Sequence, residues 1–143
     1  MSVGGYDEAV YRLYLAQVPM FAACTDAQID EVRGLAEPRT LNPGTVIVQE
    51  GDPGDEFFVL GSGEAAVSRG GEKVDHLGVG DFFGELALFD EAPRNATVVA
   101  DSGVTVLVLG RTEFQRLLSD LPGFRDSVLM GMARRLHALD ARA

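Results

Sequence analysis

Residues 56–81 read EFFVLGSGEAAVSRGGEKVDHLGVGD, and this stretch decides the fold. It contains three short runs rich in apolar or β-branched residues, and glycine-containing turns separate them: 57–60, 65–68 and 74–77. Runs of this length bounded by Gly, Ser and Asp are typical of strands joined by tight turns. The stretch therefore predicts a series of antiparallel strands.

The same pattern extends over residues 38–110, where three further strand-like runs occur at 45–49, 97–100 and 104–109. A spacing of about 8 to 12 residues between strands is typical of antiparallel sandwiches and barrels. We expect an α+β fold: a jelly-roll-like antiparallel β-roll flanked by N-terminal helices (1–37) and C-terminal helices (111–143). A chain of 143 residues suits one domain, and we expect it to span 1–143.

The flanking zones change to a helical period. Thr25 with Gln28, and Thr112 with Gln115, have the spacing of capping boxes and predict two helix starts. A longer helix is predicted from Phe124 towards Ala141. Its apolar stripe consists of Phe124, Val128, Met132, Leu136 and Leu139. Core packing explains most of this stripe, and a dimer seam or a movable lid is the alternative.

Charge excludes some classes of partner. The formal net charge is −10, and Arg94 is the one cation between residues 74 and 110, among six carboxylates. An acidic surface disfavours a general nucleic-acid interface, since phosphate backbones require clustered cations. The sequence has no secretion signal and no apolar run near the roughly 20 residues of a membrane span. We expect a cytoplasmic protein without membrane contact, in which the single cysteine, Cys24, is a small buried hydrophobe.

Residue inventory argues against the common catalytic and metal motifs. The chain has two histidines, His76 and His137, and one lysine, Lys73, so multi-histidine metal sites and a phosphate loop ending in Gly-Lys have no candidates. We expect no catalytic residues, no metal and no cofactor, and the enzyme hypothesis has no support.

Residues 83–98, FGELALFDEAPRNATV, carry the chemistry. Helix formers interrupt the strand pattern here, and a short helix beginning beside Gly84 offers unpaired backbone N–H groups to an anion. Arg94 can contact two anionic oxygens, and Glu85 can accept hydrogen bonds from hydroxyl groups. A ligand with a phosphate and a diol suits this set. The alternative is a surface ion pair of Arg94 with Asp90 or Glu91, with Glu85 serving only as a helix cap.

The stretch resembles the phosphate-binding cassette of the cyclic nucleotide-binding domain family. The resemblance rests on Phe-Gly-Glu-Leu-Ala-Leu at 83–88 and on Pro-Arg-x-Ala-Thr-Val at 93–98. Residues 50–64 also resemble the family's early strands and turns. Regulatory subunits of cyclic-AMP-dependent protein kinase, cyclic-nucleotide-gated channels and bacterial catabolite activator proteins contain such domains. The resemblance implies a β-roll that binds a cyclic purine nucleotide.

Residue by residue, the resemblance implies a ligand-binding set. Glu85 would accept from the ribose 2′-hydroxyl, and the backbone of Gly84 would approach the sugar. Arg94 would pair with the exocyclic phosphate oxygens, and Thr97 would contact the purine. Backbone amides near the phosphate would come from Leu86, Ala87 and Asn95.

One position departs from the kinase members of the family. After the arginine these usually have alanine in cAMP binders and threonine in cGMP binders, whereas this chain has Asn95. We favour cAMP over cGMP because the Arg-rich, Lys-poor composition resembles that of bacterial members that sense cAMP.

The resemblance also implies a moving part. In the family the C-terminal helix swings so that an apolar residue covers the base, and Leu136, His137 or Leu139 could be that lid. The chain would then be a sensor whose partner is an unidentified protein effector or a second copy contacted through the C-terminal helix, either alone or within a longer protein. The alternative is a β-roll that serves as a structural or interaction module without binding nucleotide.

Overall fold

The computed structural model describes the chain except for residues 1–14, 16–17, 86–87, 89–92 and 143. The helical elements are η1 (Pro19–Phe21), α2 (Asp26–Leu35), α4 (Arg111–Asp120) and α5 (Pro122–Arg142). The strands are β1 (Glu37–Leu41), β2 (Val46–Val48), β3 (Glu56–Ser62), β4 (Ala65–Arg69), β5 (Glu72–Leu77), β6 (Phe82–Phe83), β7 (Thr97–Ala100) and β8 (Val104–Gly110).

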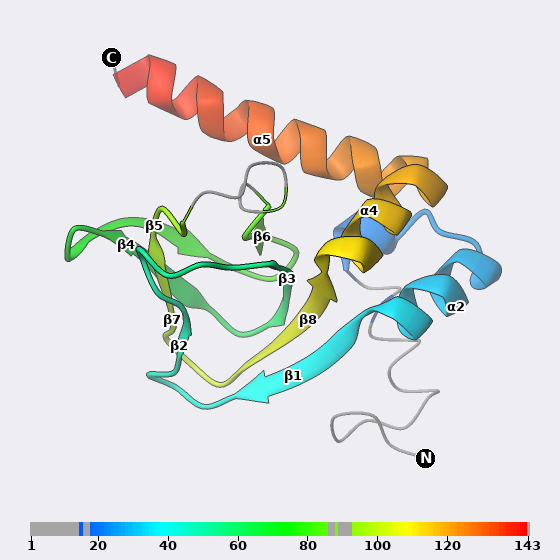
Figure 1. Ribbon diagram of the computed structural model, residues 1–143, viewed down its shortest axis with the longest axis horizontal. Helices are drawn as coiled ribbons and strands as arrows, with labels where there is room; N and C mark the ends of the chain where they lie inside the picture. Colours follow the sequence, from blue (N-terminus) through cyan, green and yellow to red (C-terminus); the bar gives the residue numbers. More distant parts are fainter. Residues whose placement is uncertain (1–14, 16–17, 86–87, 89–92, 143) are drawn as a thin grey trace.

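Two four-stranded antiparallel sheets form a roll, with strand orders β1-β8-β3-β6 and β2-β7-β4-β5. Helices η1, α2 and α4 gather at one end of the roll, and α5 extends from there across it (Figure 1). The predicted α+β fold, an antiparallel roll flanked by helices, is confirmed. Each strand run predicted from the sequence corresponds to an observed strand.

In the sheet β1-β8-β3-β6, the inner strands β8 and β3 are buried on both faces. Phe58, Leu60 and Val106 face the second sheet inside the roll. Their sequence neighbours Phe57, Val59 and Leu107 face the helices on the other side. Alternation along a strand places successive side chains on opposite faces, so a strand covered on both sides must be apolar throughout. This explains the uninterrupted apolar runs of β3 and β8.

The helical layer packs on the outer face of this sheet through a cluster of aromatic rings in tilted and edge-to-face contact. The Phe57 ring lies 4.6 Å from that of Phe114 in α4 and 5.8 Å from that of Phe124 in α5, between ring centroids. It also lies 5.6 Å from the ring of Phe82 in β6. Phe57 therefore joins the roll to both C-terminal helices.

The predicted start of α2 is confirmed in detail. The Thr25 hydroxyl accepts from the backbone N–H of Gln28, and the Gln28 side chain accepts from the backbone N–H of Thr25. The predicted cap at Thr112 is wrong: α4 begins at Arg111, and Gly110 is its N-cap without a side-chain hydrogen bond. Strand β8 runs directly into this helix, which leaves no loop residue to serve as a cap.

Other sequence expectations had mixed outcomes. Strands β1 and β6 were not predicted. Cys24 is only partly buried, although it packs against the core, and this burial raises the pKa of its thiol. In the α5 stripe, Phe124 and Val128 are fully buried, whereas Leu136 is 64% exposed, so core packing does not extend to Leu136. Of the zone predicted to hold the N-terminal helices (1–37), residues 1–14 and 16–17 lie outside the described residues, and the rest contains η1 and α2.

Phe57→Ala should destabilise the protein by about 3 to 5 kcal/mol, because it removes the ring that joins β3 to both C-terminal helices and leaves a cavity. Urea unfolding followed by circular dichroism measures this. Val46→Ala is the control, since Val46 is half exposed and its truncation should change the free energy of unfolding by less than about 0.5 kcal/mol. Equal effects of the two substitutions would contradict the packing role of Phe57.

Candidate functional site

The candidate site lies where the chain crosses between the two sheets. Gly84 and Glu85 directly follow β6, which pairs with β3 in the first sheet. Arg94 precedes β7, which belongs to the second sheet. The backbone N–H of Leu88 donates to the Glu85 carbonyl at 3.0 Å, so the crossing begins with a turn. The rest of the predicted short helix lies outside the described residues.

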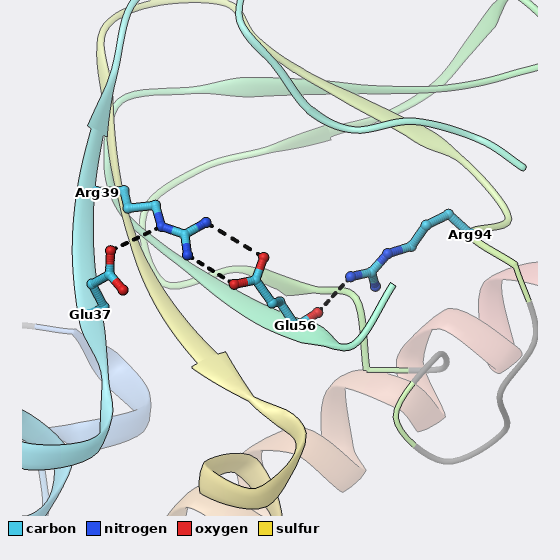
Figure 2. A network of polar contacts seen from close by, with 4 residues as sticks. All are labelled: Glu37, Arg39, Glu56 and Arg94. Carbon is cyan, nitrogen blue, oxygen red and sulfur yellow. Dashed lines mark hydrogen bonds and ion pairs between the residues drawn. The ribbon is translucent and has the colours of Figure 1, made fainter. Parts of the chain in front are cut away.

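Arg94 is buried and held by main-chain groups. Its Nη2 donates to the Glu56 carbonyl at 2.7 Å, as drawn in Figure 2, and its Nη1 donates to the Gly84 carbonyl at 3.0 Å. Its own backbone exchanges two hydrogen bonds of 2.8 Å with the turn at Gly51 and Asp52. Both the main chain and the guanidinium of Arg94 therefore have defined positions.

Two glycines allow this arrangement. Gly84 has φ of 91°, and a Cβ there would lie 2.8 Å from both Arg94 Nη1 and the Glu56 carbonyl oxygen. A Cβ at Gly54 would run into the guanidinium itself. Both positions exclude larger side chains because the arginine occupies the space.

Burial lowers the pKa of Arg94, while the nearby carboxylates of Glu56, Asp55 and Glu85 oppose this shift. The expected alternative of a surface ion pair is wrong, because the residue is only 8% exposed. Asp90 and Glu91 lie outside the described residues. Within the described part of the chain, Arg94 Nε is buried and has no hydrogen-bond partner. A buried cation with an unpaired donor suits an anionic ligand.

Glu85 is 3% exposed, and its carboxylate accepts a hydrogen bond from Arg135 of α5. The same guanidinium donates to the Phe82 carbonyl and lies 4.6 Å from the centre of the Phe82 ring. One turn earlier, Gly131 packs so closely on that ring that a Cβ would collide with it. Helix α5 therefore contacts both β6 and the buried carboxylate of Glu85 through Arg135.

A family model described as "Cyclic nucleotide-binding domain" matches residues 38–120. The chain belongs to the cyclic nucleotide-binding domain family. The cAMP-dependent protein kinase regulatory subunit of Hypocrea atroviridis is 41% identical over 132 residues, which cover 92% of this chain and 29% of that protein. The cGMP-dependent protein kinase of Toxoplasma gondii is 39% identical over 110 residues, covering 77% of this chain and 11% of that kinase.

Solved structures agree with this membership. The structure of cAMP-bound PfPKA-R (141–441) is similar with a TM-score of 0.76 and 30% sequence identity, covering 92% of this chain and 47% of that one. The chain therefore spans less than half the length of each relative described. The bacterial origin expected from the composition is contradicted by the fungal kinase subunits among the relatives.

The other cyclic nucleotide-binding positions predicted from the cassette lie as follows. Asn95 is exposed, and its carbonyl accepts from Arg69 Nε at 3.0 Å. The Thr97 hydroxyl accepts from the backbone N–H of Glu50 at 2.9 Å, which connects β7 to the segment that follows β2. Leu86 and Ala87 lie outside the described residues.

Of the candidate lid residues, Leu136 lies on α5 with its side chain exposed. His137 and Leu139 belong to the same helix, and their side chains lie outside the described part. The structure therefore leaves the lid assignment as a prediction.

Sequence reasoning missed Arg135, Glu56 and Gly54 as parts of the site. Arg135 lies late in α5, where a cation also suits the helix dipole, and its contact with Glu85 joins positions 50 residues apart. Glu56 contributes its main-chain carbonyl, which no side-chain pattern reveals. Gly54 belongs to the turn 51–55, which was interpreted only as a strand connection.

Two hollows flank these residues. One of about 550 Å³ is lined by Gly54, Pro93 and Arg111, among others. The other, of about 490 Å³, lies between α5 and the end of β5 and includes Phe82, Arg134 and Arg135. Neither hollow has Arg94 or Glu85 among its lining residues. Among the described residues, no cluster of His, Cys, Asp and Glu suits a metal ion, and no helix is long and apolar enough to cross a membrane.

Gly54→Ala should lower the free energy of unfolding by about 1 to 3 kcal/mol, because its methyl group overlaps the Arg94 guanidinium and forces a shift in a packed site. Urea denaturation gives the value. Gly78→Ala is the matched control: nothing lies within 4 Å of a Cβ there, so the change should not destabilise the protein. An unchanged stability of Gly54→Ala would show that the Arg94 side chain lies elsewhere.

Proposed function

We propose that this chain is a cyclic nucleotide sensor that binds cAMP in preference to cGMP. The observation that carries the proposal is Arg94, a buried arginine held by the Gly84 and Glu56 carbonyls, in a family whose members bind cyclic nucleotides. Positioned in advance, a guanidinium loses little conformational entropy when it contacts a phosphate.

The ligand-binding roles follow from the cassette. Arg94 contacts the exocyclic phosphate oxygens, and Glu85 accepts from the ribose 2′-hydroxyl. Gly84 brings its backbone to the sugar, while Leu86, Ala87 and Asn95 donate backbone N–H groups. Thr97 contacts the purine. The buried, mutually close charges of Arg94 and Glu85 support this division, since a cyclic nucleotide has both an anion and a hydroxyl group to offer them.

Binding is coupled to α5 in this proposal. The carboxylate that would accept from the ribose is the one that accepts from Arg135. A hydroxyl that replaces this guanidinium removes one of the contacts holding α5 against β6. The helix can then change its position, and Leu136, His137 or Leu139 covers the base.

We further propose that residues 1–143 act as one regulatory domain without catalysis, and that the protein is cytoplasmic. Its partner is a protein effector or a second copy bound through α5. Binding of cGMP, or a module that binds neither nucleotide, is the competing outcome. Because one of the relatives is a cGMP-dependent protein kinase, binding of cGMP is tested alongside cAMP.

Arg94→Ala should weaken cAMP binding at least about 30-fold, because it removes the cation that faces the phosphate. Glu85→Ala should weaken it about tenfold or more, since a hydrogen bond to a charged group is lost. Isothermal titration calorimetry with cAMP and then cGMP measures both constants and the base preference.

Arg116→Ala is the control for these variants, because Arg116 lies on the exposed side of α4 and pairs with Asp120. Arg94→Lys keeps the charge without the planar fork and covers the case in which Arg94→Ala fails to fold. Unchanged affinity in folded Arg94 and Glu85 variants would disprove the site, and no binding of either nucleotide by the unmodified protein would disprove the function.

Arg135→Ala should tighten cAMP binding about fivefold or more, because the ribose no longer competes with a guanidinium for Glu85. Arg134→Ala removes a neighbouring exposed arginine from the same helix and should leave the affinity unchanged. Weaker binding by Arg135→Ala would contradict the competition.

The same competition predicts motion of α5. Spin labels at Ala133→Cys and Val46→Cys, in a Cys24→Ser background, report the separation of α5 from the far sheet by pulsed electron paramagnetic resonance. Added cAMP should shift the distance distribution in the protein with Arg135 and shift it less in Arg135→Ala. An identical distribution with and without bound cAMP would disprove the coupling.

A further inference from the structure

An ion pair between β1, an edge strand, and β3, an inner strand, lies next to Arg94. Arg39 of β1 donates to both carboxylate oxygens of Glu56 in β3, at 2.9 Å from Nη2 and 3.5 Å from Nη1 (Figure 2). Arg39 Nε also donates to Glu37 at 3.2 Å. These strands are not neighbours, because β8 lies between them. The pair therefore bridges the central strand.

Glu56 takes part in two interactions, one through its side chain and one through its main chain. Its carboxylate is held by Arg39, and its main-chain carbonyl accepts from Arg94 Nη2 at 2.7 Å. Glu56 is also the first residue of β3, at the point where the strand emerges from the turn 51–55. Strand ends have fewer ladder hydrogen bonds than strand centres, so a side-chain anchor has most effect on the backbone there.

We propose that Arg39 and Glu56 are positioning residues for Arg94: the ion pair fixes the start of β3, and the Glu56 carbonyl fixes the guanidinium that receives the phosphate. This inference rests on the proposed nucleotide binding. Neither side chain contacts the ligand. The Arg39 and Glu56 side chains are 38% and 36% exposed, and contact through both carboxylate oxygens restricts their positions more than a single surface contact does.

Two mechanisms make opposite predictions for Glu56→Gln. If the pair acts only through its electric field, removing a negative charge near Arg94 strengthens anion binding. If the pair positions Arg94, Glu56→Gln breaks the ion pair with Arg39 and weakens binding, although the main-chain carbonyl of residue 56 is still present. Arg39→Ala weakens binding under both mechanisms and tests whether the pair matters at all.

The experiment measures cAMP affinity by calorimetry, in the full chain, for Arg39→Ala, Glu56→Gln, their double variant and Arg39→Lys. We expect Arg39→Ala and Glu56→Gln each to weaken binding about three- to tenfold. The double variant should equal a single one, since both break the same pair. Arg39→Lys should recover part of the loss.

Two further measurements separate positioning from general destabilisation. Combined with Arg94→Lys, the Arg39→Ala change should have no further effect on affinity, because the group it positions is altered. Arg116→Ala breaks a different surface ion pair and should leave the affinity unchanged. Tighter binding by Glu56→Gln, or equal losses with and without Arg94→Lys, would overturn the inference. If the unmodified protein binds no cyclic nucleotide, the proposed function itself is disproved. If the unmodified protein binds and the Arg39 and Glu56 variants bind equally well, only the positioning role is disproved.

Discussion

Burying the charge of Arg94 is unfavourable unless its N–H groups and its charge find partners, and the surrounding chain supplies them. Three segments distant in sequence provide the contacts: the turn 51–55, the start of β3 and the residues after β6. Each donates or accepts through the main chain, so the arrangement depends on backbone conformation more than on side-chain identity. The glycines at 54 and 84 follow from this constraint.

Helix α5 is connected to the same centre by a second arginine. Arg135 joins Glu85 and the Phe82 carbonyl, and Gly131 lets the helix lie directly on the Phe82 ring. Under the proposed function, a ribose hydroxyl takes the place of Arg135 as the partner of this buried carboxylate, because a buried charge left without a partner is costly.

Much of this fold is predictable from its apolar patterns. Strands β3 and β8 appear in the sequence as continuous apolar runs because both of their faces are buried. The sequence pattern does not predict strand β1, because the strand contains Pro38 and two charged residues. An edge strand paired only with β8 tolerates them. The cassette could be recognised from Gly84, Glu85 and Arg94. The carbonyl groups that accept from Arg94 could not be predicted, since every residue has a main-chain carbonyl and residue type does not show which one is used. Nor does the sequence distinguish Arg135 from Arg134 as the arginine that contacts Glu85.

The side chains on the two faces of the sheet β1-β8-β3-β6 belong to different hydrophobic clusters. Phe57 and Phe58 are consecutive, yet one packs among the helices and the other inside the roll. The same strand backbone therefore places Phe57 among the helices, Phe58 inside the roll and the Glu56 carbonyl beside Arg94, so the helical layer, the interior of the roll and the candidate site share one structural element.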